Sequence, residues 1–129
     1  MLFLYQIIVT IFLIISPIVL ILRIIKNKED KKRFKEKLSI PSKKKTSENL
    51  IWFHGASVGE LNSIIPIIKN YEKKKSINQI LITTTTLSSY EVFKKFNFKK
   101  TIHQYYPIDH PILTNSFLNY WKPKIAIFI

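Results

Sequence analysis

The chain of 129 residues contains no cysteine, only two glycines and only eight acidic residues. Without cysteine it can form neither a disulfide framework nor a thiolate metal site, which is compatible with a cytoplasmic location. Its 21 Lys and Arg residues leave a net charge of +13, so an anionic surface or partner is indicated. The length allows one domain of ordinary size.

Both glycines fall in the short segment Gly55–Gly59, which reads GASVG and is followed by Glu60. The residues in front of it, 49–54, are apolar and β-prone. An apolar helical face follows it, formed by Leu61, Ile64, Ile65 and Ile68. A strand, a glycine-bearing turn and a helix start are therefore predicted. Since glycine suits tight turns and close backbone approach to a ligand, a reactive centre is expected at this turn.

Three interpretations of this turn are open. Ser57 and Glu60 fit a capping box, in which each side chain accepts a hydrogen bond from the other residue's backbone N–H. The same residues match the G-x-S-x-G nucleophile elbow, with Ser57 as nucleophile and Asp109, His103 and His110 as available partners. A nucleophile elbow normally follows several strands, whereas a basic linker precedes this turn. This difference argues against the nucleophile interpretation. The third interpretation makes Glu60 a general base at a sugar-acceptor site.

The N-terminal segment Leu2–Leu22 is almost wholly apolar, and about 20 such residues can cross a membrane as a helix. It lacks an early basic region and a small-residue cleavage site, so residues 1–25 are predicted to be an uncleaved anchor. The lysines that follow place the rest of the chain in the cytoplasm. Because Pro17 would kink the helix, and Tyr5 and Gln6 soften its start, a helix in the membrane plane is the alternative.

Residues 26–48 are predicted to be a basic membrane-surface helix and linker. Eleven of the basic residues lie between Arg23 and Lys45, opposed by three acidic ones. Their position beside an apolar segment favours anionic lipid headgroups over nucleic acid as the partner. Lys26–Leu38 lacks glycine and proline, which predicts a helix, and residues 40–47 are typical of a loop.

From Leu50 onward, predicted strands alternate with predicted helices. Strands are expected at 50–54, 79–84, 103–106 and 124–129, the last one buried, and helices at 60–74, 88–96 and 111–120. This alternation predicts an α/β fold with a Rossmann-like parallel sheet and helices on both faces, formed by residues 49–129.

Ligands of such sheets bind beyond the carboxyl ends of the strands. The Gly55–Glu60 turn and the threonine run Thr83–Thr86 are both expected at that edge. A structural role is the alternative to ligand contact for these threonines, because threonine favours strands and can cap the N-terminus of a helix. Because the sequence ends at Ile129 within a predicted strand, we expect this domain to be truncated at its C-terminus.

Five stretches follow the apolar anchor in order: Arg33–Lys37 (RFKEK), Trp52–Glu60 (WFHGASVGE), Leu81–Ser89 (LITTTTLSS), His103–Asp109 (HQYYPID) and Phe117–Pro123 (FLNYWKP). In this order and spacing they resemble the amino-terminal part of 3-deoxy-D-manno-octulosonic acid (Kdo) transferases. The resemblance covers essentially the whole chain. One departure is Ser39, where the family often has a glycine just behind its basic segment.

The resemblance implies a two-domain GT-B glycosyltransferase of lipopolysaccharide biosynthesis at the cytoplasmic face of a bacterial inner membrane. Such an enzyme moves Kdo from CMP-Kdo to a hydroxyl of a lipid A precursor, with inversion and without a metal or other cofactor. The amino-terminal domain receives the lipid acceptor, and the carboxyl-terminal domain holds the nucleotide donor.

The resemblance also implies roles for the turn. Glu60 matches the family's proposed catalytic base, a role that requires a carboxylate within about 3 Å of the attacking hydroxyl. The residues expected to bind the acceptor are Gly55, Ala56, Ser57, Val58 and Gly59. Since the family pattern continues past Ile129, the chain alone is expected to be inactive. The alternative is a non-catalytic, membrane-bound remnant that binds the acceptor.

Overall fold

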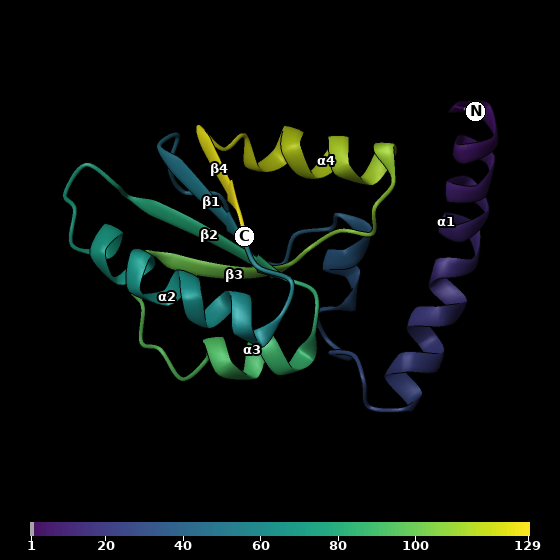
Figure 1. The fold of residues 1–129 in the computed structure, drawn as a ribbon, viewed down its shortest axis with the longest axis horizontal. Helices are drawn as coiled ribbons and strands as arrows, with labels where there is room; N and C mark the ends of the chain where they lie inside the picture. Colours follow the sequence, from purple (N-terminus) through teal and green to yellow (C-terminus); the bar gives the residue numbers. More distant parts are fainter. Residues whose placement is uncertain (1) are drawn as a thin grey trace.

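The computed structural model describes residues 2–129, which form one parallel sheet flanked by helices and a separate apolar helix (Figure 1). In chain order the elements are α1 (Leu2–Ile25), η1 (Phe34–Leu38), β1 (Leu50–His54), α2 (Val58–Glu72), β2 (Gln79–Thr84), α3 (Leu87–Phe93), β3 (Thr101–Tyr105), α4 (Pro111–Trp121) and β4 (Ile125–Phe128). The predicted α/β alternation is confirmed, with element ends shifted by up to three residues.

The sheet has the strand order β3-β2-β1-β4, and all of its strands are parallel. The chain runs from β1 outward to β3 through α2 and α3, which share one face. It then crosses back through α4, on the opposite face, to reach the other side of β1 (Figure 1). The connections therefore change direction between β1 and β4. In open α/β sheets, ligands bind at the carboxyl ends of the strands beside such a switch point.

Alternating side chains of the strands build a core on each face of the sheet. One core packs against α2 and is formed by Ile51, Phe53, Leu61, Ile64, Ile65, Ile68, Ile77, Ile80 and Ile82. The other packs against α4 and is formed by Leu50, Trp52, Leu81, Phe117 and Trp121. Because the strands are covered on both faces, residues 50–53 of β1 and 80–82 of β2 are continuous apolar runs with no polar alternation.

The last strand differs from its prediction. It forms as expected and pairs with β1, but the expectation that it is buried is wrong, since Ile125 and Phe128 are 54% and 55% exposed. The physical reason is that β4 lies at the edge of the sheet, while Phe117 and Trp121 of α4 pack over β1 and β2.

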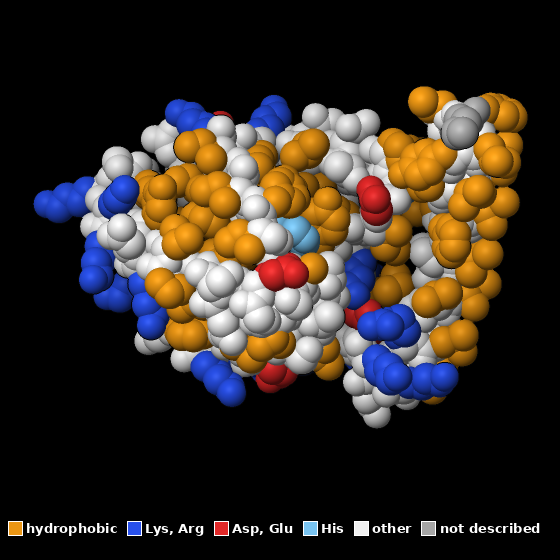
Figure 2. All heavy atoms as spheres, viewed as in Figure 1, with side chains coloured by type: hydrophobic (Ala, Val, Ile, Leu, Met, Phe, Trp, Pro, Cys, Tyr) orange, Lys and Arg blue, Asp and Glu red, His pale blue; other side chains and the backbone are white. Residues whose placement is uncertain are grey.

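Helix α1 stands beside the sheet domain and exposes most of its hydrophobic side chains (Figures 1 and 2). Of its 24 residues only Ser16 and Leu20 are buried. Within residues 2–129 it is the one helix long and apolar enough to cross a membrane. By length and composition alone, a signal sequence would meet the same criterion.

The predicted membrane-surface helix over Lys26–Leu38 is wrong. The chain leaves α1 through Asn27, which has the left-handed φ of 53°, and only Phe34–Leu38 is helical, as a short 3-10 turn. The Asp30 carboxylate accepts a hydrogen bond from the backbone N–H of Arg33 at 3.1 Å. Such side-chain bonds to nearby backbone compete with α-helix formation.

Contacts with β3 hold this segment in its irregular conformation. Arg33 donates two hydrogen bonds of 2.8 Å to the Glu36 carboxylate and one of 2.7 Å to the carbonyl of His103. Glu36, which is fully buried, accepts a further bond of 2.8 Å from the backbone N–H of Tyr105. The segment therefore packs against the β3 edge of the sheet, where it satisfies backbone groups that would otherwise stay unpaired.

The backbone conformation of Ser39 explains why the family that the sequence resembles often has a glycine at this position. It ends η1 with a φ of 59° and a ψ of 25°, a left-handed conformation that glycine adopts at the least cost. Its side chain compensates in part by donating to the carbonyl of Leu113 at 2.5 Å.

Candidate functional site

The Gly55–Glu60 turn leaves β1 at the carboxyl edge of the sheet, beside the switch point between β1 and β4. Two hydrogen bonds join it to the threonine run that ends β2. The N–H of Gly55 donates to the carbonyl of Thr83 at 3.1 Å, and the Thr85 hydroxyl donates to the carbonyl of Ala56 at 2.8 Å. The expectation that both segments share this edge is confirmed, as is the N-cap, which Thr86 provides for α3.

The two glycines serve different physical needs. A Cβ on Gly55 would lie 2.9 Å from Cδ1 of Ile64 and 3.3 Å from the backbone carbon of Glu60, so a larger residue here would require α2 side chains to shift. A Cβ on Gly59 would meet nothing nearer than the Ser57 hydroxyl at 3.9 Å. Neither glycine has a positive φ. Gly55 is therefore fixed by packing, whereas Gly59 leaves open space on the first turn of α2.

The predicted capping box is confirmed in both directions. Ser57 Oγ accepts from the N–H of Glu60 at 3.2 Å. Glu60 Oε2 accepts from the N–H of Ala56 at 2.6 Å and, more weakly, from that of Ser57 at 3.4 Å. The other carboxylate oxygen, Oε1, has no hydrogen-bond partner among residues 2–129. The Glu60 carboxylate is therefore held in one orientation with one oxygen free.

No histidine of the described chain is hydrogen-bonded to Ser57. Both ring nitrogens of His103 are engaged elsewhere, by Arg33 at 3.1 Å and by Thr84 at 2.8 Å. His110 caps α4 by accepting from the backbone of Ile112. The structure therefore brings together none of the partners that a serine nucleophile would need, and Ser57 acts as a helix cap.

Histidine 54 is a site residue that the sequence interpretation missed. It is the last residue of β1, and its Nδ1 lies 2.9 Å from the Thr83 hydroxyl. The same hydroxyl accepts a hydrogen bond of 2.9 Å from the Trp52 indole, which can only donate. The Thr83 hydroxyl, which can accept two hydrogen bonds and donate one, therefore links the His54 ring to the Trp52 indole.

The surroundings of His54 keep it neutral and in place. Burial lowers the pKa of His54 below its usual value, although the nearby Glu60 carboxylate opposes this shift. The ring packs 4.3 Å from Tyr106 and 5.4 Å from Phe128, measured between ring centroids. A neutral imidazole therefore lies on the same edge as the Glu60 carboxylate. Its position could have been found from the sequence, because the residue that ends a parallel strand faces the ligand edge.

A second histidine is buried on the opposite face. Burial, followed by the neighbouring Arg33 guanidinium, holds the pKa of His103 well below its usual range. Because Arg33 can only donate, His103 accepts through Nδ1 and donates through Nε2 to the Thr84 hydroxyl. This histidine joins the basic segment to the sheet and is not part of the carboxyl-edge site.

The groups available at this edge are the Glu60 carboxylate and the His54 imidazole. Within residues 2–129 no three His, Cys, Asp or Glu side chains gather in a way that could hold a metal ion. A carboxylate with a free oxygen can take a proton from a hydroxyl, and an imidazole can hydrogen-bond to the same ligand. The fold is that of an α/β domain with a parallel sheet, and this edge is its candidate site.

Comparison with known proteins gives the family. The family model described as 3-deoxy-D-manno-octulosonic-acid transferase (kdotransferase) matches residues 32–129. The chain therefore belongs to the Kdo transferase family. This family assignment confirms the resemblance found in the sequence and identifies the chain as glycosyltransferase-related.

Named relatives agree with this assignment. A protein of Arabidopsis thaliana named "Probable 3-deoxy-D-manno-octulosonic acid transferase, mitochondrial" is 39% identical over 97 residues, covering 75% of this chain and 22% of its own. The 3-deoxy-D-manno-octulosonic acid transferase of Rickettsia bellii is 37% identical over 112 residues, which cover 87% of this chain and 27% of the relative. The 3-deoxy-D-manno-octulosonic acid transferase of Aquifex aeolicus is 32% identical over 99 residues, which cover 76% of this chain and 26% of the relative. The chain thus spans about a quarter of these relatives. No solved structure matches it significantly.

Proposed function

We propose that this chain is the acceptor-binding part of a GT-B Kdo transferase, which transfers Kdo from CMP-Kdo to a hydroxyl of a lipid A precursor. The observation that carries the proposal is the Glu60 carboxylate, fixed at the switch point of the sheet with one oxygen free. The family membership supplies the reaction. The donor is held mainly by a carboxyl-terminal domain, as in the two-domain architecture.

In this mechanism Glu60 Oε1 takes the proton of the acceptor hydroxyl. The hydroxyl oxygen attacks the anomeric carbon of Kdo from the face opposite to CMP. The bond from that carbon to the CMP oxygen breaks, and CMP leaves with the electron pair. One glycosidic bond forms with inversion, and the proton stays on Glu60 until it is released to solvent.

The groups around Glu60 prepare this step. The N–H groups of Ala56 and Ser57 hold Oε2, so the carboxylate has one orientation before the acceptor arrives. The His54 imidazole hydrogen-bonds to the acceptor and thereby positions the attacking hydroxyl. The open surface at Gly59 gives the sugar room to approach the first turn of α2.

Binding at this turn can be tested with the two glycines. Because the chain has only Gly55 and Gly59, protein labelled with ¹⁵N-glycine gives two backbone amide signals, both from the proposed site. A lipid A precursor added in detergent is expected to shift both signals in a saturable way. Phosphatidylglycerol in the same detergent is the matched control and should leave them in place. Signals that stay unmoved at saturating acceptor would overturn acceptor binding at this turn.

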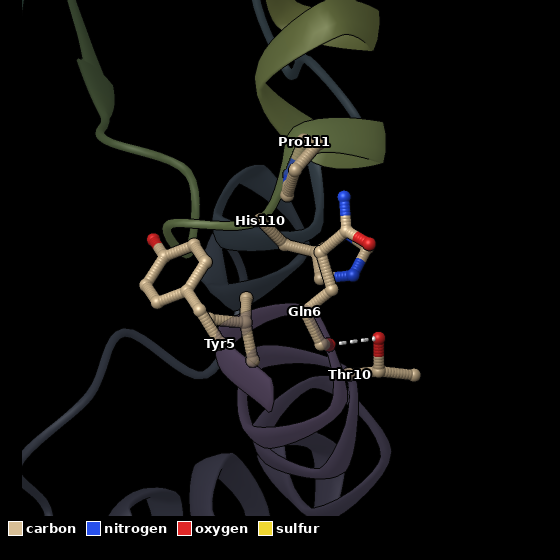
Figure 3. Close-up of a pocket in the computed structure, with 6 residues that line it drawn as sticks. Tyr5, Gln6, Thr10, His110 and Pro111 are labelled. Atoms are coloured by element: carbon tan, nitrogen blue, oxygen red, sulfur yellow. Dashed lines mark hydrogen bonds between the residues drawn. The ribbon is translucent and has the colours of Figure 1, made fainter. Parts of the chain in front are cut away.

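The domain is placed against the cytoplasmic face of the membrane by α1 and the basic residues behind it. Both ends of α1 lie beside the domain. Tyr5 and Gln6 line a cavity of about 230 Å³ with His110, the N-cap of α4, and Pro111 (Figure 3), and Leu20 and Ile108 line a second cavity. If α1 crossed the bilayer in this arrangement, the exposed Asp109 of the domain would lie at the depth of the hydrocarbon core. Placing a carboxylate there costs free energy. The arrangement favours the helix in the membrane plane.

Removal of residues 2–25 is expected to make membrane binding salt-sensitive. The remaining basic residues would attract anionic headgroups, and this attraction weakens as the Debye length falls from about 10 Å at 0.1 M salt to about 3 Å at 1 M. Flotation with anionic vesicles should recover the full chain at both salt concentrations, but the truncated chain only at the lower one. Truncated protein that floats equally well at 1 M salt would show that α1 is not the anchor.

A further inference from the structure

The contact between α1 and the domain contains a cavity that protein side chains do not fill. It has a volume of about 340 Å³ and lies on the stripe of α1 that faces the domain. The residues that line it are Phe12, Ile15, Ser16, Val19, Leu20, Arg23, Glu29, Lys37 and Ile108. The cavity is open to its surroundings, and its volume is in the range of ligand sites. Figure 2 shows the opening between α1 and the domain.

The walls of this cavity are apolar along α1. Phe12, Ile15, Val19 and Leu20 form one side, and Ile108 forms the other. The one hydroxyl among the lining residues of α1, that of Ser16, donates to the carbonyl of Leu13 at 2.7 Å and so presents no free donor. From Phe12 to Leu20 the helix rises about 12 Å. An elongated hydrocarbon chain therefore fits the chemistry of the walls.

One end of the cavity is positively charged. Glu29 Oε1 accepts from Lys37 Nζ at 2.6 Å and from Arg23 Nε at 2.7 Å, so two cations share one carboxylate. The Arg23 side chain is 43% exposed, and its two terminal NH₂ groups have no hydrogen-bond partner among residues 2–129. A guanidinium with both of these groups free can bind a phosphate through two hydrogen bonds.

We infer that this cavity binds one anionic phospholipid of the membrane, with an acyl chain along α1 between Phe12 and Leu20 and its phosphate on Arg23. Charge complementarity selects an anionic headgroup, because the two cations outnumber Glu29. The membrane is the source, because the outer face of α1 exposes Ile14 and Ile18 by 70% and 60%. The bound lipid fills the space between α1 and the domain and fixes the helix against it. This site is separate from the Glu60 edge and does not depend on the transfer reaction.

Photo-crosslinking in vesicles tests this site directly. The probes are phosphatidylglycerol and phosphatidylcholine that carry the same diazirine-labelled acyl chain, used with the full chain under conditions where all of it is vesicle-bound. Peptide mass spectrometry then locates the labelled residues. Phosphatidylglycerol is expected to label the cavity residues of α1 and Ile108 about fivefold more than phosphatidylcholine does. This ratio corresponds to the attraction of one basic residue to an anionic headgroup. Both probes should label Ile14 and Ile18 equally.

Two pairs of variants separate the headgroup from the chain. Arg23→Gln should abolish the preference for phosphatidylglycerol in the cavity, whereas Lys32→Gln, at an exposed site without an ion pair, should keep it. Ile108→Trp should lower cavity labelling by both probes, whereas Ile112→Trp, on the exposed side of α4, should not. Labelling confined to the outer face of α1 in the unmodified chain would overturn the proposal. So would equal cavity labelling by the two probes.

Discussion

A Glu60→Gln variant is expected to transfer Kdo roughly 10²–10⁴-fold more slowly than the unmodified protein, which is the usual loss when a general base is removed. Glutamine keeps the shape of the side chain, and its carbonyl oxygen can accept the hydrogen bonds of 2.6 and 3.4 Å from the turn. The amide then presents an NH₂ group where Oε1 stood. It cannot take a proton from the acceptor, so the rate falls while the fold is retained.

The measurement needs a complete transferase. A chimera in which residues 1–129 replace the matching segment of the Rickettsia bellii relative supplies one, since that relative is 37% identical over 112 residues. Ser57→Ala in the same chimera is the control. It removes the other half of the capping box and should cost about 1 kcal/mol of stability but leave much of the turnover. Near-normal transfer by Glu60→Gln would exclude Glu60 as the base. Loss of activity in folded Ser57→Ala, with a covalent adduct on Ser57 of the unmodified chimera, would instead favour the nucleophile interpretation.

Replacement of Arg33 by alanine is expected to destabilise the fold by about 3–5 kcal/mol, the range for breaking a buried ion pair by removing one partner. The Arg33 side chain is 12% exposed and that of Glu36 is 1% exposed, so the carboxylate would be left without its counter-ion away from water. The carbonyl of His103 would also lose its bond of 2.7 Å. A loss of this size is a large part of the stability of an ordinary domain.

Urea unfolding of the chain measures this loss against a matched control. Lys35→Ala, two residues away at an exposed position without an ion pair, should change the free energy of unfolding by less than about 0.5 kcal/mol. Arg33→Met combined with Glu36→Leu should recover only part of the stability, because it removes the unpaired buried charge but leaves the Tyr105 N–H and the His103 carbonyl without these partners. An Arg33→Ala variant as stable as Lys35→Ala would show that this segment does not hold the fold together.

The local features of the site were predictable because they depend on neighbouring residues. The capping box needs only Ser57 and Glu60 three positions apart, and the strand-turn-helix order follows from apolar runs on both sides of Gly55. The parallel sheet follows from helices long enough to cross over between strands. These patterns are short in sequence, and the structure confirms them.

The features that were missed depend on contacts between residues far apart in the sequence. The run of charged residues over Lys26–Leu38 predicted a surface helix. Arg33 instead donates a hydrogen bond to His103, 70 positions away, and this contact outweighs helix propensity. The hydrogen bond that holds the His54 ring is made with Thr83, on a different strand. The exposure of β4 follows from its place at the sheet edge, which the apolar character of its residues does not reveal.

The central claim is that these residues form the acceptor half of a Kdo transferase. Its most direct test is to incubate the unmodified chimera with CMP-Kdo and a lipid A precursor and to measure the mass of the lipid product. We predict a lipid that has gained Kdo, together with release of CMP. A folded chimera that yields no Kdo-bearing lipid, under conditions where the Rickettsia bellii protein does, would contradict the claim and favour a non-catalytic acceptor-binding role.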